Sequence, residues 1–289
     1  MNTELHYDFE NYLLTNGSIA DKMRLIAAGF GNEQLRNQVI TDLEASMNKD
    51  GGIRFGYKPE APSSVKETAE VLVLLVSFAD DYSSLVERMV SFLVSRQKKD
   101  GGFAETLNLD PHIEDKWGAA GGRNWYPVGK SITWLTGKAL EALCLVEYDD
   151  VERLRRARDF LLYSQNEDGH WPDFKGQNES DPLATGNILE GLRAMKIDSR
   201  NKVIVDGRAA LMQHLKDCIE SKSTFDMVDL PAVGAPESEQ EKELIRDGLK
   251  LIMESQNEDG GWIPLGAKKS DPELTSLLIL ALQKCKFFC

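Results

Sequence analysis

The sequence has little positive charge for its size. Its 289 residues include 34 lysines and arginines against 47 aspartates and glutamates, which gives a formal net charge of -13. A nucleic-acid groove needs clustered positive charge, so the composition predicts no nucleic-acid partner. A basic face for docking on anionic lipid is excluded by the same shortage. We interpret the acidic excess as surface charge that favours solubility.

Long apolar runs and leader signals are also missing. No stretch approaches about 18 uninterrupted apolar residues, so no membrane-spanning helix is expected. The first residues, MNTELHYDFENYLLTNG, lack a basic segment followed by an apolar run, so no signal peptide is predicted. The four cysteines form no Cys-x-x-Cys pair, and we expect neither a metal nor a cofactor. These absences predict a cytoplasmic protein with reduced thiols.

One short segment, by contrast, occurs four times. The copies, which we call joints, read SQNEDGHW (Ser164–Trp171), SQNEDGGW (Ser255–Trp262), SRQKKDGGF (Ser95–Phe103) and SMNKDGGI (Ser46–Ile53). Each joint follows an amphipathic helical pattern. Glycine accepts the left-handed conformation past a helix end, and aspartate can bond the free backbone groups of the turn. We therefore interpret the joints as turns between helices and not as a catalytic site used repeatedly.

The joints divide the chain into helical pairs. An amphipathic helix precedes each joint, as at 151–164 and 240–255, and an almost wholly apolar helix follows it. Counting outward predicts six units, of which the first is short and the fifth, beginning at 203–221, is degenerate and has no joint. Helices that are apolar all round need neighbours on both sides, so a closed ring is expected. The prediction is an all-α fold, a single (α/α)6 toroid of six inner and six outer helices that spans residues 1–289 as one domain.

Two of these segments carry a family resemblance. RARDFLLYSQNEDGHW (Arg156–Trp171) and RDGLKLIMESQNEDGGW (Arg246–Trp262) resemble the QW motif of squalene and oxidosqualene cyclases. Most of the chain is similar to the prenyltransferase and squalene-hopene cyclase repeat family, and this resemblance implies the α/α toroid. Gly122–Leu143 is also similar to a cavity-lining segment of triterpene cyclases, with Trp125 at the family's tryptophan and Trp134 near its tyrosine.

The resemblance also shows which family motifs are missing. The aspartates of the DxDD acid motif would fall in VKETA (Val65–Ala69), where only Glu67 remains. The Asp-x-Cys and later histidine with which protein prenyltransferases hold zinc have no counterpart. The DDxxD motif is not met at Ala79–Ser84 or Tyr148–Arg153, each of which has two aspartates without the third. The sequence therefore predicts a family member without a standard acid motif.

The spacing after the second joint is unusual. Thr68 follows the joint aspartate Asp50 by 18 positions, whereas Thr136 follows Asp100 by 36. The insertion, Glu105–Trp134, is rich in aromatic residues, and long connections in compact repeats are more often functional than idle. Aromatic faces bind apolar chains and stabilise carbocations. The predicted substrate-binding residues are Glu67, Trp117, Arg123, Trp125, Tyr126 and Trp134.

Three carboxylates of the insertion are the predicted acids. Asp110, Glu114 or Asp115 would protonate an alkene if an apolar pocket raised its pKa. His112 and Glu114 alone are too few for a metal site. The opposing interpretation is that the insertion plugs the ring and its tryptophans belong to the core. A second irregular stretch, Ser223–Gln240, brings Asp226 and Asp229 either to the same mouth or to a surface loop.

The leading functional prediction is a terpene-cyclase-like enzyme, an isomerase or lyase, that acts on an isoprenoid or similar apolar substrate in the toroid cavity. The first alternative is a non-catalytic repeat protein that binds a hydrophobic ligand or a partner protein. The second is a carbohydrate-active α/α toroid that uses the acidic, tryptophan-bearing insertion as a sugar platform. The oligomeric state stays open.

Overall fold

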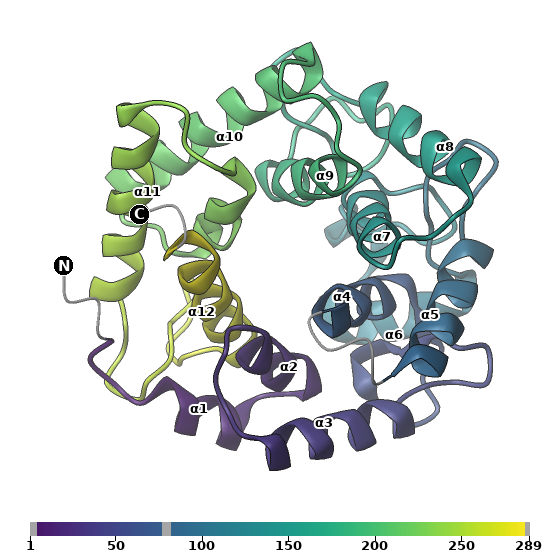
Figure 1. Cartoon of the computed structure of the whole chain (residues 1–289), viewed down its shortest axis with the longest axis horizontal. Helices are drawn as coiled ribbons and strands as arrows, with labels where there is room; N and C mark the ends of the chain where they lie inside the picture. The colour runs from purple at the N-terminus through teal and green to yellow at the C-terminus, as the bar shows by residue number, and fades with distance from the viewer. Residues whose placement is uncertain (1–4, 77–81, 287–289) are drawn as a thin grey trace. The chain divides into compact units, whose positions relative to one another are not determined.

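The computed structural model describes residues 5–76 and 82–286, and these residues are mostly helical (Figure 1). The strands among them are β1 (Ile53–Arg54) and β2 (Ser63–Ser64), which form one short antiparallel pair. The prediction of an all-α fold is confirmed. One compact unit contains the residues up to Asp42 and from Leu211 onward, and the other contains Leu43–Ala210. The single domain over 1–289 stays a prediction, and Asp80 and Asp81 lie outside the described residues.

The helices alternate in character along the chain. The first helices of the repeats are α1 (Phe9–Asn16), α3 (Glu33–Ala45), α5 (Ser83–Ser95), α8 (Val151–Leu162), α10 (Lys202–Ser221) and α11 (Glu239–Glu254). The second helices are α2 (Ile19–Ala27), α4 (Val65–Leu75), α7 (Thr133–Leu145), α9 (Pro182–Ala194) and α12 (Pro272–Lys286). The second helix of the fifth repeat is replaced by η5 (Phe225–Val233), a 3-10 helix with Pro231 inside it. The count of six repeats stays a prediction.

The second helices pack closely within their units. In the unit formed by Leu43–Ala210, α7 lies between α4 and α9 (Figure 1). The approach of α7 and α9 requires glycine on both helices. A Cβ atom added at Gly137 would lie 2.7 Å from the carbonyl oxygen of Asn187, and one at Gly191 would lie 2.4 Å from that of Gly137. Fully buried aliphatic side chains such as Leu72 and Leu135 then contribute about 1.5–3 kcal/mol each.

The joints explain why threonine recurs at the start of the second helices. In the second joint the Thr136 hydroxyl accepts from the backbone N–H of Phe103 at 2.9 Å and donates to the Ile132 carbonyl at 2.6 Å. Thr68 makes the same two bonds with Ile53 and Ser64. The hydroxyl thus ties the joint to the first turn of the helix that follows it.

The other joint side chains are engaged in the same way. The Asp168 carboxylate accepts from the backbone N–H of His170 and the hydroxyl of Ser180. The Gln165 amide donates to the Gly169 carbonyl and to Val203 at the start of α10. Trp171 is fully buried, and its indole N–H donates to the Leu161 carbonyl at 2.7 Å. The side chains of the joint therefore hold the turn and link it to the next repeat.

The insertion contributes three short helices between the second joint and α7. These are η3 (Leu107–Leu109), α6 (Asp110–Trp117) and η4 (Ala120–Gly122). A further 3-10 turn, η1 (Phe55–Tyr57), follows the first joint. Of the helices in the described ranges, none has the length and apolar character required to cross a membrane.

Candidate functional site

A buried arginine organises the insertion. Arg123 is 2% exposed, and its guanidinium donates to the carbonyls of Gly118 at 2.9 Å and Tyr126 at 3.0 Å. It also forms an ion pair with Asp110. These bonds connect the beginning and the end of α6 to the segment that carries the aromatic residues. Arg123, predicted from the sequence to bind substrate, has its donors engaged by the insertion itself.

Four aromatic residues of the predicted site form one cluster. Tyr126 stacks on Trp125 with ring centroids 5.4 Å apart. The Tyr126 ring also lies 5.0 Å from that of Trp134 and 5.5 Å from that of Trp117. Tyr126 and Trp134 are buried, whereas Trp117 and Trp125 keep part of their surface exposed. The structure thus brings these four predicted residues together and leaves two of the rings partly exposed.

Next to this cluster lies a buried carboxylate, Glu105. It accepts from the Tyr126 hydroxyl and the Ser64 hydroxyl, both at 2.8 Å. It also accepts from the backbone N–H groups of Val65 and Lys66, at the N-terminal end of α4, where the helix dipole favours negative charge. Burial nevertheless raises the pKa of Glu105 above its usual value, and the nearby charge of Glu67 raises it further.

Glu67 is the second buried carboxylate and lies in the first turn of α4. It is 3% exposed, and one of its oxygens accepts a long bond of 3.4 Å from the backbone N–H of Gly56. Its other oxygen is buried and has no hydrogen-bonding partner among the residues that the structure describes. The charge of Glu67 therefore acts on Glu105, whose pKa it helps to raise.

The three predicted acids lie in different surroundings. Asp110 is partly exposed and paired with Arg123, while Glu114 and Asp115 are exposed on α6. Asp115 lies 3.5 Å from the ammonium group of Lys58. The expectation that an apolar pocket surrounds these carboxylates is therefore wrong. Their catalytic role stays a prediction.

The sequence analysis missed a position shared by two joints. Glu105 and Asp173 each stand two residues after the aromatic residue that ends a joint, Phe103 and Trp171. Glu105 binds the start of α4, and the backbone carbonyl of Asp173 accepts from the N–H of Thr133 at the start of α7. Burial, followed by the neighbouring carboxyl of Asp181, raises the pKa of Asp173 to about 7. Extending the alignment of the joints by two positions would have revealed both carboxylates.

A hollow lies beside the first joint. Its volume is about 530 Å³, and its lining includes Asp50, Arg54, Arg96, Thr106 and Asn108. These polar and charged side chains do not offer the apolar lining expected for an isoprenoid. The aromatic cluster of the insertion is not part of this lining.

The comparisons with known proteins concern both sequence and fold. The profile of the family described as "Squalene-hopene cyclase C-terminal domain" matches residues 32–218. Lanosterol synthase of Saccharomyces cerevisiae is 34% identical over 158 residues, which cover 49% of this chain and 18% of that protein. The chain thus spans less than a fifth of the length of this relative.

Solved structures share the fold at low sequence identity. The type II terpene cyclase MstE from Scytonema, solved as a variant with geranylgeranyl dihydroxybenzoate described as its substrate, has a TM-score of 0.69 at 14% identity, covering 94% of this chain and 87% of that one. An alpha-amylase from Clostridium perfringens has a TM-score of 0.63 at 12% identity, covering 92% and 84%. The predicted terpene-cyclase toroid fold is confirmed, and the amylase shows that this fold alone does not specify a reaction.

Proposed function

Because the chain belongs to the squalene-hopene cyclase C-terminal domain family, we propose that it is a terpene-cyclase-like enzyme that acts on an isoprenoid or a similar apolar substrate. The observation that carries the proposal is the pair of buried carboxylates, Glu67 and Glu105, beside the aromatic cluster of the insertion. An acid and electron-rich ring faces are the two groups that alkene protonation and carbocation cyclisation require.

In the proposed reaction Glu67 is the acid. Its carboxyl proton is transferred to one carbon of an alkene, and the π-electron pair forms the new C–H bond. The adjacent carbon becomes a carbocation, which the faces of Trp117 and Trp125 stabilise. The cation then loses a proton to a base, which yields an alkene again, so that atoms and charge balance. Glu105 is held by four donors, three of them at the start of α4, and therefore serves to position the helix that carries Glu67.

This assignment replaces the missing DxDD motif by Glu67, which stands at the corresponding helix start. The buried oxygen of Glu67 supports the choice, because no donor among the residues that the structure describes occupies it and it is free to contact a substrate. The predicted role of Asp110, Glu114 and Asp115 as acids is the competing assignment within the same proposal.

The experiment incubates the full chain with linear isoprenoids of increasing length, both hydrocarbons and diphosphates, and analyses extracts by gas chromatography and mass spectrometry. We expect a cyclic or isomerised product from at least one substrate. Glu67→Gln should lower the rate by about 10²- to 10⁴-fold, the usual contribution of a general acid. Glu114→Gln is the matched control on α6 and should retain the wild-type rate.

Two outcomes would contradict the proposal. If no isoprenoid yields product and none raises the melting temperature, the chain does not act on this class of substrate. If product forms but Glu114→Gln loses activity while Glu67→Gln retains it, the acid is on α6 and the assignment to Glu67 is wrong.

A second candidate function is binding of a hydrophobic ligand without catalysis. It is favoured by the way Trp117, Trp125, Tyr126 and Trp134 pack against one another, as a plug would. Thermal protection by an isoprenoid that is recovered unchanged would support this candidate. A carbohydrate-active protein stays the third prediction, for which the polar hollow beside Asp50 is the site to test with oligosaccharides. The cytoplasmic location also stays a prediction.

A further inference from the structure

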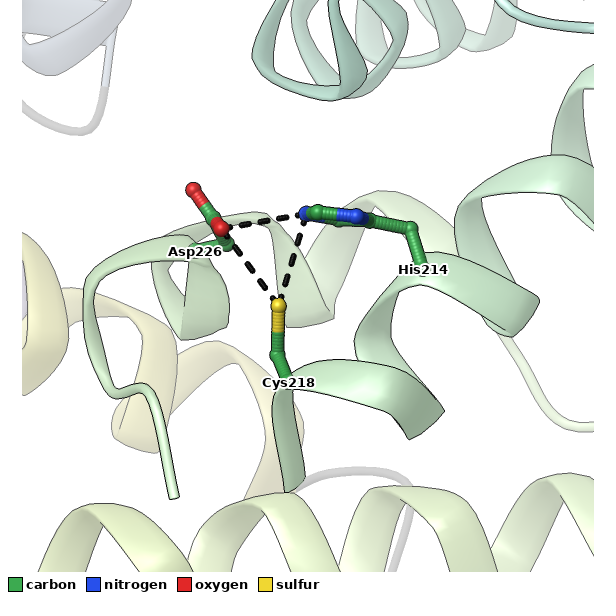
Figure 2. A group of neighbouring side chains, drawn as sticks. All are labelled: His214, Cys218 and Asp226. Carbon is green, nitrogen blue, oxygen red and sulfur yellow. Dashed lines mark hydrogen bonds and ion pairs between the residues drawn. The ribbon is translucent and has the colours of Figure 1, made fainter. Parts of the chain in front are cut away.

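Three side chains of the fifth repeat meet at one point. His214 and Cys218 stand four residues apart on α10, so both lie on the same face of that helix. Asp226 comes from the beginning of η5 and points back toward them (Figure 2). All three residues belong to the same compact unit. Cys218 is buried, and the other two side chains keep part of their surface exposed.

The ligand atoms form a nearly regular triangle. Nε2 of His214 lies 3.0 Å from Oδ2 of Asp226 and 3.5 Å from Sγ of Cys218, and Sγ lies 3.4 Å from Oδ2. A tetrahedral zinc ion with ordinary bonds to nitrogen, oxygen and sulfur would separate its ligand atoms by about 3.4–3.6 Å. The three side chains therefore match one face of a zinc tetrahedron to within about 0.4 Å without a change of rotamer.

A nucleophilic triad would be arranged differently. In such a relay the thiol and the carboxylate bind opposite nitrogens of the imidazole, so that a proton can pass across the ring. Here the thiol and the carboxylate both contact Nε2 of His214, and they also contact each other. One atom at the centre of the triangle can bind all three groups, whereas a proton relay cannot use them in this order.

We propose that His214, Cys218 and Asp226 bind a zinc ion. An imidazole, a thiolate and a carboxylate are all ordinary zinc ligands, and the thiolate excludes magnesium and calcium as preferred ions. The three residues would leave the fourth position of a tetrahedral ion for water or another small ligand. The site is distinct from the Asp-x-Cys and later histidine of protein prenyltransferases, because the order of the ligands and the elements that carry them differ.

The irregular fifth repeat indicates a structural role for the zinc ion. The fifth repeat has no joint, and η5 replaces its second helix. In the fourth repeat, the hydrogen bonds of Asp168 and Thr185 hold the joint, which follows the first helix, to the start of the second helix. The zinc ion would connect the last turns of α10 to the beginning of η5, which is the connection that the missing joint leaves without these bonds.

The test uses the full chain without an affinity tag that binds metal. Protein freed of metal by a strong chelator is titrated with Co²⁺ and then with Zn²⁺. We expect about one metal ion per chain, a near-ultraviolet thiolate-to-cobalt charge-transfer band, visible bands of tetrahedral cobalt, and loss of both on addition of zinc. Zinc should also raise the melting temperature of the chain, because it binds the folded state.

Cys218→Ser and His214→Ala should each weaken zinc binding by more than about 100-fold, since even groups that only support a zinc ligand contribute about 10- to 100-fold. Cys144→Ser and His112→Ala are the matched controls, because these residues lie on α7 and α6 and not in the triangle. Both should bind cobalt as the wild type does. His214 is partly exposed, so His214→Ala still tests the site if Cys218→Ser fails to fold.

The proposal is overturned if the wild type binds no stoichiometric metal or shows no charge-transfer band. It is equally overturned if Cys218→Ser keeps the band, or if Cys144→Ser loses it to the same extent. Stoichiometric zinc that depends on both His214 and Cys218, with the two controls unaffected, supports it.

Discussion

The third and the fifth repeats both depart from the regular pattern, and they do so in opposite directions. The third gains a long insertion after its joint, while the fifth loses its joint and its second helix. The insertion collects aromatic rings around two buried carboxylates, Glu67 and Glu105. The fifth repeat collects a histidine, a cysteine and an aspartate around a single point.

The comparison of these repeats shows where a repeat protein has polar side chains that its turns do not need. In the regular fourth repeat the polar side chains Gln165, Asp168 and Thr185 are all used by the turn. An insertion adds residues that the turn does not need, and the loss of a turn leaves helix-facing residues without its hydrogen bonds. Both irregular repeats are therefore better candidates for a functional site than the repeated joint itself.

The largest effect should come from a joint. We expect Trp171→Ala to lower the free energy of unfolding by about 3–5 kcal/mol, because the ring is fully buried and its N–H is bonded. Trp125→Ala, in the insertion, should cost less than half of this, because the ring is partly exposed, and should instead weaken isoprenoid binding. Urea unfolding of both variants measures this contrast. Equal losses of stability would mean that Trp125 of the insertion belongs to the hydrophobic core, as Trp171 of the joint does, and would contradict the contrast between the two regions.

A smaller effect is expected where α7 meets α9. Gly137→Ala would place a methyl group 2.7 Å from the Asn187 carbonyl oxygen, so the helices must separate, at a cost of about 1–3 kcal/mol. Gly121→Ala in the insertion is the matched control, since no atom lies within 4 Å of its added Cβ. It should change stability by no more than about 0.5 kcal/mol. A neutral Gly137→Ala in thermal unfolding would show that the packing of the regular helices is looser than these distances indicate.

The smallest effect concerns pH and the carboxylates two positions after the joints. The pKa of Asp173 is raised from 3.8 to about 7, so the folded state holds this proton more tightly than the unfolded chain. The resulting stabilisation is complete below about pH 4 and is lost as the pH rises through about 7. Because the Asp173 carboxyl is incompletely desolvated, which weakens the effect, we expect a loss of about 1–2 kcal/mol between these limits.

Urea unfolding at several pH values measures this loss. Asp173→Asn should flatten the dependence over this range, whereas Glu114→Gln, which removes an exposed carboxylate, should leave it unchanged. The pKa of Glu105 is raised in the same direction, so a remaining slope in Asp173→Asn that disappears in Glu105→Gln would extend the rule to the second joint. A stability that increases with pH across this range would show that neither carboxyl is held protonated.

Part of the candidate site followed from the sequence and part did not. The insertion was located by spacing alone, and Trp117, Trp125, Tyr126 and Trp134 do lie together, because aromatic residues close in sequence pack readily. The choice of Asp110, Glu114 and Asp115 rested on an apolar environment that those side chains lack. An eight-residue helix such as α6 has an exposed face, and acidic residues on a short helix occupy that face by default.

Glu105 shows what the sequence could not indicate. Its four donors come from Ser64, Val65, Lys66 and Tyr126, which lie between 21 and 41 positions away. Nothing in the local pattern distinguishes it from the other carboxylates of the insertion. The burial that changes its pKa arises only when the insertion folds onto the start of α4.

The sequence by itself determined the repeated turn, the alternation of amphipathic and apolar helices, and therefore the fold class, because capping, turn formation and periodicity act between residues a few positions apart. It also marked the two repeats that break the pattern. Tertiary structure alone decided which carboxylates are buried and which histidine, cysteine and aspartate meet. Those properties depend on contacts between separate elements, and a side chain's electrostatic environment is set by the elements packed around it and not by its neighbours in the chain.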